Sequence, residues 1–352
     1  MQATNGSSVR FSSRNRLIGC AMALMLALSA LAFASTARAE TTPVSQTYLA
    51  LGDSLAFGYS QQLFNENIPF GAPPTAFEHG YTNDYLGNKV KEGMQLTNKG
   101  CPGETTDSLI GNGPLAAALG IPGESPCAYH KAGLPLHSEY GGKSQLESAL
   151  ETIAVDAASG TPVTKLSLDI GANDIFRSER ACKAEVKAEL EGPEHKSKYG
   201  STPEEAVQNC VKAHIPETYQ HIVENTGRIL FVIRNGSTFG GVNYTGPIIF
   251  LELYDSSGAV FTPGVELFPG SVEAVGVLNR EQGKVVTSFA GCTTNPLPTF
   301  NPQNKQEPER LQLYTNMANF TESNGKKNGP DIHPTPVGYE KLANLMGTEC
   351  GK

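Results

Sequence analysis

The sequence predicts an α/β fold, a three-layer α/β/α sandwich around a central parallel sheet. Short apolar runs that end in glycine or an acid predict strands over 47–53, 163–171 and 247–255. Longer segments with helical spacing separate these strands, and this alternation is typical of a parallel sheet covered on both faces. Polar residues follow the first two strands, at the end of a parallel sheet where ligands bind.

The first strand, T-Y-L-A-L-G-D (47–53), ends where glycine and aspartate interrupt the apolar run. Helices are expected over three segments: 145–158, 203–234 and 335–347. In the first of them, Leu146, Leu150 and Ile153 recur at the spacing of one helix face. In the second, Pro216 leaves a break in the helix as an open alternative.

Four segments lack such periodicity. Residues 60–86 contain Pro69, Pro73 and Pro74 and are predicted to be loop-like. Three segments rich in Gly, Pro, Asn and charged residues predict long surface loops: 111–144, 177–202 and 292–330.

Residues 1–39 have the three parts of a secretory signal peptide. Arginines precede an apolar run over 17–34, and A-R-A (37–39) predicts cleavage before Glu40. An uncleaved anchor helix is the alternative, but 18 residues lie at the short edge of what spans a bilayer. We therefore expect an extracellular protein of one domain, residues 40–352, without stable membrane insertion after cleavage.

The mature chain is acidic. It holds 23 Lys and Arg against 35 Asp and Glu, a net charge of −12, because the first 39 residues remove four arginines and no acid. An acidic surface repels nucleic acid and anionic membranes, so neither is an expected partner.

Six cysteines remain after cleavage, since Cys20 leaves with the signal segment. An even number in an exported chain favours disulfides, and six cysteines allow 15 pairings. The spacing favours local pairs in sequence order, which would pin the long loops: Cys101 with Cys127, Cys182 with Cys210, and Cys292 with Cys350. No C-x-x-C or H-E-x-x-H occurs, so no metal site is expected.

Ser54 lies in L-A-L-G-D-S-L-A-F-G (49–58), directly after the first strand and at the start of an expected helix. A serine there can be a helix N-cap or a nucleophile, since helix N-termini favour developing negative charge. Asn173, in D-I-G-A-N-D-I-F (169–176), follows another strand, so both residues are expected at the same edge of the sheet.

Two further blocks carry chemistry. In C-P-G-E-T-T (101–106), Gly103 can bring a backbone N–H close to a reacting atom. In D-I-H-P (331–334), Asp331 lies two residues before His333, and an acid at this distance can orient an imidazole. Asp53 and Asp174 are expected to bond nearby backbone. The other histidines have no comparable setting.

Together these blocks resemble the GDSL family of SGNH hydrolases, which are secreted serine esterases and lipases. The family's serine corresponds to Ser54 in G-D-S-L, its asparagine to Asn173 in G-x-N-D, and its glycine to Gly103, with Gly100 as the less favoured choice. Its histidine corresponds to His333. Here the acid precedes the histidine by two residues, whereas the family pattern is D-x-x-H. In some relatives a backbone carbonyl holds the histidine instead.

The resemblance implies a flavodoxin-like sheet and a carboxylic-ester hydrolase that works through an acyl-enzyme without metal or cofactor. Ser54 would be the nucleophile, His333 the base and Asp331 its orienting acid. The Ser54 and Gly103 amides and the Asn173 side chain would bind the oxyanion. Substrates would be small-molecule or lipid esters; the oligomeric state is not predicted.

Two alternative functions stay open. A carbohydrate O-acetyl esterase or an acyltransferase would use the same Ser–His site, and a secreted binding protein would keep the fold without turnover. Aromatic residues following the serine either wall an acyl pocket or pack the adjoining loop: Phe57, Tyr59, Phe64, Phe70, Phe77, Tyr81 and Tyr85.

Overall fold

Five parallel strands form the central sheet of the computed structural model, which describes residues 45–89, 93–256, 270–302, 310–317 and 331–351. The strands are β1 (Gln46–Gly52), β2 (Met94–Asn98), β3 (Val163–Asp169), β4 (Ile248–Leu251) and β5 (Cys292–Thr294). Their order is β2-β1-β3-β4-β5, and every neighbouring pair is parallel. The predicted α/β class with a parallel sheet is confirmed.

Alternate residues of β1 point to opposite faces of the sheet, as the period of a strand requires. Leu49 and Leu51 belong to the larger core, whereas Tyr48 and Ala50 belong to the core on the other face. Both faces are buried because helices cover each of them, which explains why the strands read as nearly continuous apolar runs.

The helices lie between and after the strands. Their bounds are α2 (Ser54–Phe57), α3 (Gln61–Asn67), η1 (Ile68–Phe70), η2 (Pro74–Phe77), α4 (Tyr81–Lys89), α5 (Thr106–Ile110), α6 (Pro114–Ala118), α7 (Ala128–Lys131), α8 (Gln145–Ser159), α9 (Ala172–Glu191), α10 (Pro203–Arg234), η3 (Gly236–Phe239), α11 (Ser271–Ser288), α12 (Leu297–Phe300), α13 (Arg310–Tyr314) and α14 (Pro336–Glu349).

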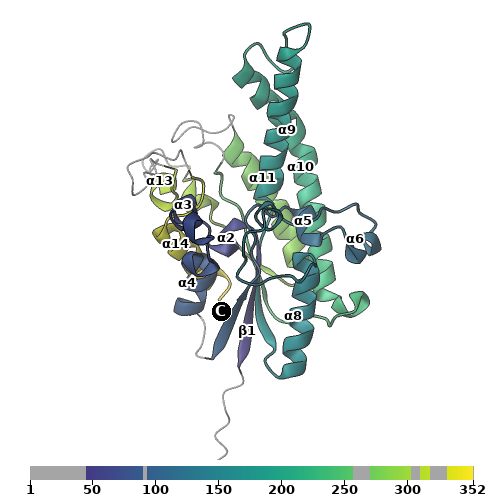
Figure 1. Cartoon of the computed structure of the whole chain (residues 1–352), viewed down its shortest axis with the longest axis vertical. Coiled ribbons are helices and arrows are strands. Elements are labelled where there is room, and N and C mark those ends of the chain that lie inside the picture. The colour runs from purple at the N-terminus through teal and green to yellow at the C-terminus, as the bar shows by residue number, and fades with distance from the viewer. Residues whose placement is uncertain (1–44, 90–92, 257–269, 303–309, 318–330, 352) are drawn as a thin grey trace, which may run out of the picture. The chain divides into compact units, whose positions relative to one another are not determined.

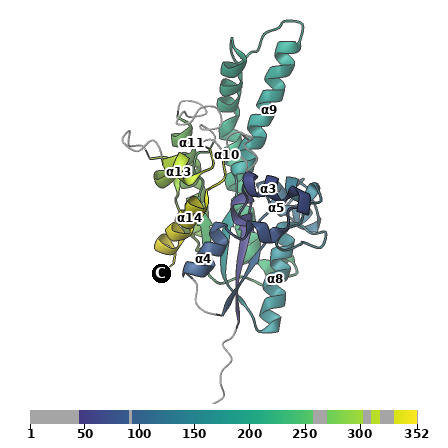
Figure 2. The ribbon, with the colours of Figure 1, turned by 60° about the vertical axis from the view of Figure 1, so that its left-hand side comes forward.

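Helices on both faces complete the three layers (Figures 1 and 2). On one face, α5, α8 and α10 pack on β1, β3 and β4 through the larger core. On the other face, α4 and α14 pack on β1 and β4. Among the described residues, no helix combines the length and the apolar character needed to cross a membrane.

Several segments predicted as loops are helical. Residues 177–202 were expected to form a loop, but α9 continues to Glu191 and lies beside α10 (Figures 1 and 2). Only four of its 20 residues are buried, and its many charged residues give the segment the composition of a solvated loop. Likewise, α3 and most of α4 lie in the predicted loop 60–86, where prolines and polar residues mask short helices.

The helix α10 passes through Pro216 without a break. A proline inside a helix costs about 3 kcal/mol, and the apolar contacts of Val211, Ile215 and Ile222 on this helix offset that cost. The predicted signal segment, residues 1–39 with Cys20, lies outside the described residues.

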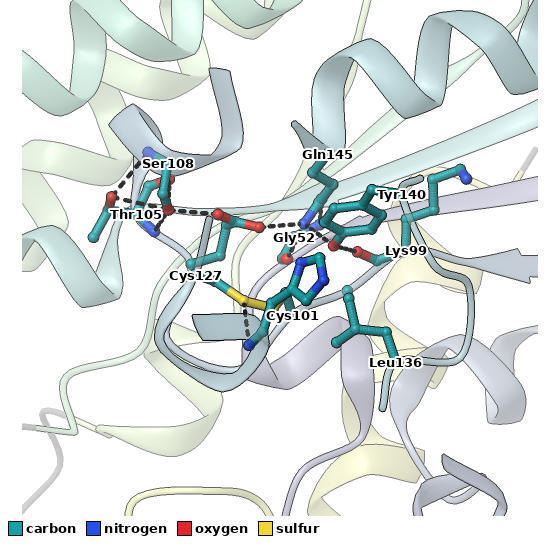
Figure 3. The surroundings of a disulfide bond; sticks show 12 residues. Gly52, Lys99, Cys101, Thr105, Ser108, Cys127, Leu136, Tyr140 and Gln145 are labelled. Atoms are coloured by element: carbon teal, nitrogen blue, oxygen red, sulfur yellow. Dashed lines mark hydrogen bonds between the residues drawn. A yellow bond between two sulfur atoms is a disulfide. The ribbon is translucent and has the colours of Figure 1, made fainter. Parts of the chain in front are cut away.

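The six cysteines of residues 40–352 are paired in sequence order, as Cys101–Cys127, Cys182–Cys210 and Cys292–Cys350. The second pair corrects part of one expectation, because Cys182 lies in the helix α9 and not in a loop, so the bond fastens α9 to α10. The first pair joins the segment after β2 to the N-cap residue of α7 (Figure 3).

Candidate active site

Ser54 is the first residue of α2, at the carboxyl end of β1. The carboxyl group of Asp53 caps this helix by accepting a 2.9 Å hydrogen bond from the Leu55 N–H. Gly52 makes the preceding turn at φ +140°, and a Cβ there would collide with Asp169, so only glycine fits. The serine hydroxyl is thus presented at the strand end, as the sequence predicted.

His333 lies against Ser54 although 279 positions separate them. Its Nε2 is 2.9 Å from the Ser54 Oγ, and its Nδ1 is 2.5 Å from Asp331 Oδ1. The carboxylate therefore occupies the place that a backbone carbonyl would take in the alternative arrangement. A spacing of two residues suffices because Asp331 Oδ1 also accepts the His333 N–H at 3.1 Å, which folds the segment back on itself.

Three hydrogen-bond donors hold the segment from Asp331 to His333 in place. The Gln61 N–H, at the start of α3, donates to Asp331 Oδ2 at 2.9 Å. Tyr254 OH donates to the Ile332 carbonyl at 2.7 Å, and the Asn316 N–H donates to the His333 carbonyl at 2.9 Å. The Tyr59 ring meets the imidazole edge-on at 4.7 Å between centroids, which restricts the rotation of His333.

Asp331 remains ionised despite its burial. Burial acts to raise the pKa of this carboxyl, but the charge and hydrogen bonds of His333, with the Gln61 N–H, outweigh it and hold the pKa below its usual value. An ionised carboxylate at Nδ1 keeps the proton of a neutral imidazole on that nitrogen. It leaves Nε2 free to accept the serine proton.

Gly103 lines the same cleft as Ser54, whereas Gly100 is buried under α2, where a Cβ would collide with the Phe57 N–H. Gly103 has φ +83°, and an added Cβ would lie 2.8 Å from that of Ala128. The structure thus favours Gly103 over Gly100 as the cleft glycine. Among the described residues, none accepts a hydrogen bond from the backbone N–H of Gly103 or Ser54.

Asn173 is the second residue of α9, after β3, and it lines the cleft with Ser54. Its Nδ2 donates to Asp53 Oδ2 at 3.3 Å. The N-cap position of α9 is Gly171, so Asn173 does not occupy it. Three potential oxyanion donors, two amides and one side chain, therefore come from the ends of β1, β2 and β3.

The cleft at this edge has a volume of about 870 Å³. Its apolar lining includes Ala128, Tyr129, Ala132 and Leu134 in and around α7, together with Phe176 of α9 and with Leu253 and Tyr254 after β4. Glu179, Arg180 and Lys183 of α9 also line it. Among the aromatic residues that follow Ser54 in the sequence, Tyr59 lines the cleft. Four others are fully buried and do not line it: Phe57, Phe77, Tyr81 and Tyr85. Phe70 is 78% exposed.

Acids and a histidine gather beside this site without forming a clear metal centre. Ligand atoms of Asp107, Asp174 and His221 lie within 4.8 Å of one another. However, the Arg177 guanidinium is 2.8 Å from Asp107 Oδ2 and supplies the positive charge there. Asp174 also accepts the Thr106 N–H at 3.0 Å, the backbone contact expected of it. These groups form an ion-pair network that joins α5, α9 and α10.

Gln145, which no sequence motif considered above marks as functional, is a fully buried side chain at the start of α8. Its Oε1 accepts the Gly52 N–H at 2.7 Å, and its Nε2 donates to the Gly52 carbonyl at 3.0 Å and to Glu104 Oε2 at 2.7 Å. Figure 3 shows this side chain between Gly52 and Tyr140. Gln145 thus fixes the turn that presents Ser54. An isolated glutamine in a helix gives no signal for such a role.

No family model matches this chain, and no curated protein matches it either. Among solved structures, phospholipase A1 from Streptomyces albidoflavus is 11% identical, with a TM-score of 0.45 over 87% of this chain and 100% of that one. A carbohydrate acetylesterase family member from Sinorhizobium meliloti is 11% identical, with a TM-score of 0.44 over 86% and 96%. An extracellular lipase from Streptomyces rimosus is 12% identical, with a TM-score of 0.43 over 86% and 99%. Because these identities and scores are low, conclusions about activity depend on the site geometry alone.

Proposed function

We propose that this chain is a serine carboxylic-ester hydrolase of the GDSL type. The observation that carries the proposal is the chain of contacts from Asp331 through His333 to Ser54, at 2.5 and 2.9 Å. A serine hydroxyl is a weak nucleophile near neutral pH, and a hydrogen-bonded imidazole oriented by a carboxylate is the arrangement that activates it.

The reaction follows from these contacts. The Ser54 Oγ attacks the ester carbonyl while its proton passes to His333 Nε2. The resulting oxyanion accepts hydrogen bonds from the Ser54 and Gly103 amides and from Asn173 Nδ2. Collapse expels the alcohol, which takes the proton from His333, and leaves an acyl-enzyme. Water then attacks the acyl group with His333 as base, which releases the acid and restores Ser54.

The cleft supports an uncharged acyl group as the part bound beside Ser54. Its wall around α7 is apolar, with Ala128, Tyr129 and Leu134. Apolar lining with a few polar groups at the reacting atoms is typical of small-ligand sites. The net charge of −12 on residues 40–352 also argues against anionic surfaces as substrates.

We also propose that the protein acts outside the cytoplasm after loss of residues 1–39. Three disulfides support this, because they persist in oxidising compartments. Sequencing the N-terminus of the exported protein tests it, with Glu40 as the expected first residue.

Hydrolysis of a p-nitrophenyl ester of a short acid tests the activity. Ser54→Ala and His333→Ala should each abolish turnover, and the two together should cost about as much as either alone, because the residues act as one unit. Ser159→Ala on α8 and His214→Ala on α10 are matched controls on exposed side chains and should keep full activity. A phosphonate that reacts with serine should label Ser54. Full turnover by folded Ser54→Ala protein would refute the proposal and leave a binding protein as the better interpretation.

A further inference from the structure

Two buried carboxyl groups lie beneath Ser54, where β1 and β3 end. Asp53 is 2% exposed and Asp169 is 1% exposed. The Asp53 N–H donates to Asp169 Oδ2 at 3.2 Å, so the Asp169 carboxyl lies against Asp53. Two buried carboxyl groups that share a site seldom both ionise, because like charges repel each other there, and a proton on one of them removes the repulsion.

The contacts indicate which carboxyl holds that proton. Asp169 accepts a hydrogen bond from Tyr81 OH at 2.6 Å and another from the Asp53 N–H, and both stabilise its ionised form. Burial and the charge of Asp169 raise the pKa of Asp53 well above its usual value. Burial also raises the pKa of Asp169, although its hydrogen bonds act against this. The pKa of both carboxyls is raised, that of Asp53 the more, so the first proton that the pair takes up goes to Asp53.

Among the described residues, acids and phenols interact electrostatically with the pair: Tyr48, Tyr81, Glu104, Tyr254 and Tyr339. Burial raises the pKa of Glu104 to about 8, so this side chain is mostly protonated at neutral pH. With one proton on the pair, a single negative charge on Asp169 would remain beneath the serine, stabilised by its donors Tyr81 OH and the Asp53 N–H.

Asp53 links this pair to the cleft. Its Oδ1 accepts the Leu55 N–H at 2.9 Å, and its Oδ2 accepts from Asn173 Nδ2 at 3.3 Å. With one N–H of Asn173 directed at Asp53, the nitrogen end of that amide is held on the side of Ser54. An amide turned by half a rotation would present its oxygen there and repel an oxyanion.

We propose that Asp53 and Asp169 share one proton and together position the Asn173 amide, so that its second N–H faces the oxyanion. Asp53 is then a positioning residue as well as the cap of α2. This inference rests on the proposed function, because it concerns how the oxyanion site is built.

The test compares Asp53→Asn, Asn173→Ala and the double variant in ester hydrolysis, with active sites counted by titration. Asp53→Asn keeps the shape and the neutrality of the protonated side chain. It replaces one of the two oxygens, which accept from the Leu55 N–H and from Asn173 Nδ2, by an NH2 group that cannot accept. We expect kcat to fall by up to the ~10²-fold that loss of an oxyanion donor costs, with KM unchanged. In the Asn173→Ala background the same change should alter kcat less than about twofold, because its effect passes through Asn173. Losses that multiply in the double variant would overturn the proposal.

Tyr81→Phe provides a second route if Asp53→Asn does not fold. It removes the donor to Asp169, whereas Tyr85→Phe on the same helix is a matched control that removes an equally buried phenol bonded to Lys165. We expect Tyr81→Phe to lower kcat several-fold and Tyr85→Phe to leave it unchanged. Equal effects of the two substitutions would refute a role for the pair.

Infrared spectra of the unliganded protein at neutral pH provide a readout without turnover. The Asp53→Asn spectrum should lose the band of one protonated carboxylic acid relative to the unsubstituted protein. If the Asp53→Asn spectrum keeps this band, the proposal that Asp53 and Asp169 share a proton is wrong, whatever the activity of the variant. Conversely, if Ser54→Ala hydrolyses esters normally, the proposed function fails while the infrared result still reports on the pair.

Discussion

Two groups of acids flank Ser54, and they behave in opposite ways. Asp331, on the His333 side, is 6% exposed, and Asp53, beneath the serine, is 2% exposed. Burial acts to raise the pKa of both carboxyls. His333 reverses the effect at Asp331, whereas the neighbouring Asp169 reinforces it at Asp53. The charge of the partner, and not the degree of burial, therefore decides which acid is ionised.

The difference assigns separate tasks to chemically identical side chains. An ionised Asp331 can stabilise the imidazolium that forms when His333 takes the serine proton. A protonated Asp53 adds no second negative charge near the oxyanion. A protonated Asp331 would make His333 a weaker base, and an ionised Asp53 would repel the negative charge of the transition state. Neutralising each acid in turn therefore tests the comparison.

The largest effect is expected from Asp331→Asn. It should lower kcat by about 10⁴-fold, because an amide that donates to Nδ1 selects the wrong imidazole tautomer. Steady-state hydrolysis of a p-nitrophenyl ester, normalised by active-site titration, measures it. The loss should exceed that of Asp53→Asn, which replaces a protonated acid by a neutral amide.

Asp156→Asn on α8 serves as the control and should leave kcat unchanged. If Asp331→Asn and Asp53→Asn lower kcat equally, the two acids do not differ in role and the comparison fails.

The sequence predicts the reacting groups better than their supports. Ser54, Asn173 and His333 lie in short blocks at the ends of elements, so their types and positions indicate chemistry without the fold. Asp331 also lay in such a block, although only the structure shows that a spacing of two lets its carboxylate reach Nδ1.

The supports act through contacts between distant parts of the chain. Gln145 meets Gly52 from 93 positions away, and Asp169 meets Asp53 from 116. Such pairings depend on strand order, which no local pattern reveals. The helix α9 was missed for another reason, since a charged helix with few buried residues resembles a solvated loop in composition.

An intermediate effect is expected from Asn173→Ala. If its amide donates to the oxyanion, kcat should fall by about 10²–10³-fold while KM changes little, because the bond matters most in the transition state. Kinetics and thermal melting on the same sample separate this from a structural role. Asn235→Ala, at the end of α10, is the matched control. An early-melting Asn173→Ala protein with normal kcat per folded molecule would leave the oxyanion to the two backbone amides.

The smallest effect is expected at Glu104, a third acid of the group beneath the serine. It is 1% exposed, and its Oε2 accepts from Gln145 Nε2 at 2.7 Å. Burial raises its pKa to about 8, whereas in the unfolded chain a glutamate releases its proton at about 4.3. Between these values the folded state binds more protons. Stability is therefore fully present at low pH and is lost as the pH rises through about 8.

Glu104→Gln should remove this dependence, because glutamine matches the shape of the protonated acid and does not titrate. Chemical denaturation of both proteins at pH 7 and pH 9 measures it. We expect the unsubstituted protein to lose about 1 kcal/mol more than the variant over this range. Asp53 and Asp169 titrate in both proteins, so the difference between them isolates Glu104. If both proteins lose the same free energy of unfolding between pH 7 and pH 9, Glu104 is already ionised at neutral pH. The buried acids beneath Ser54 would then carry a further negative charge, which contradicts their contrast with the ionised Asp331.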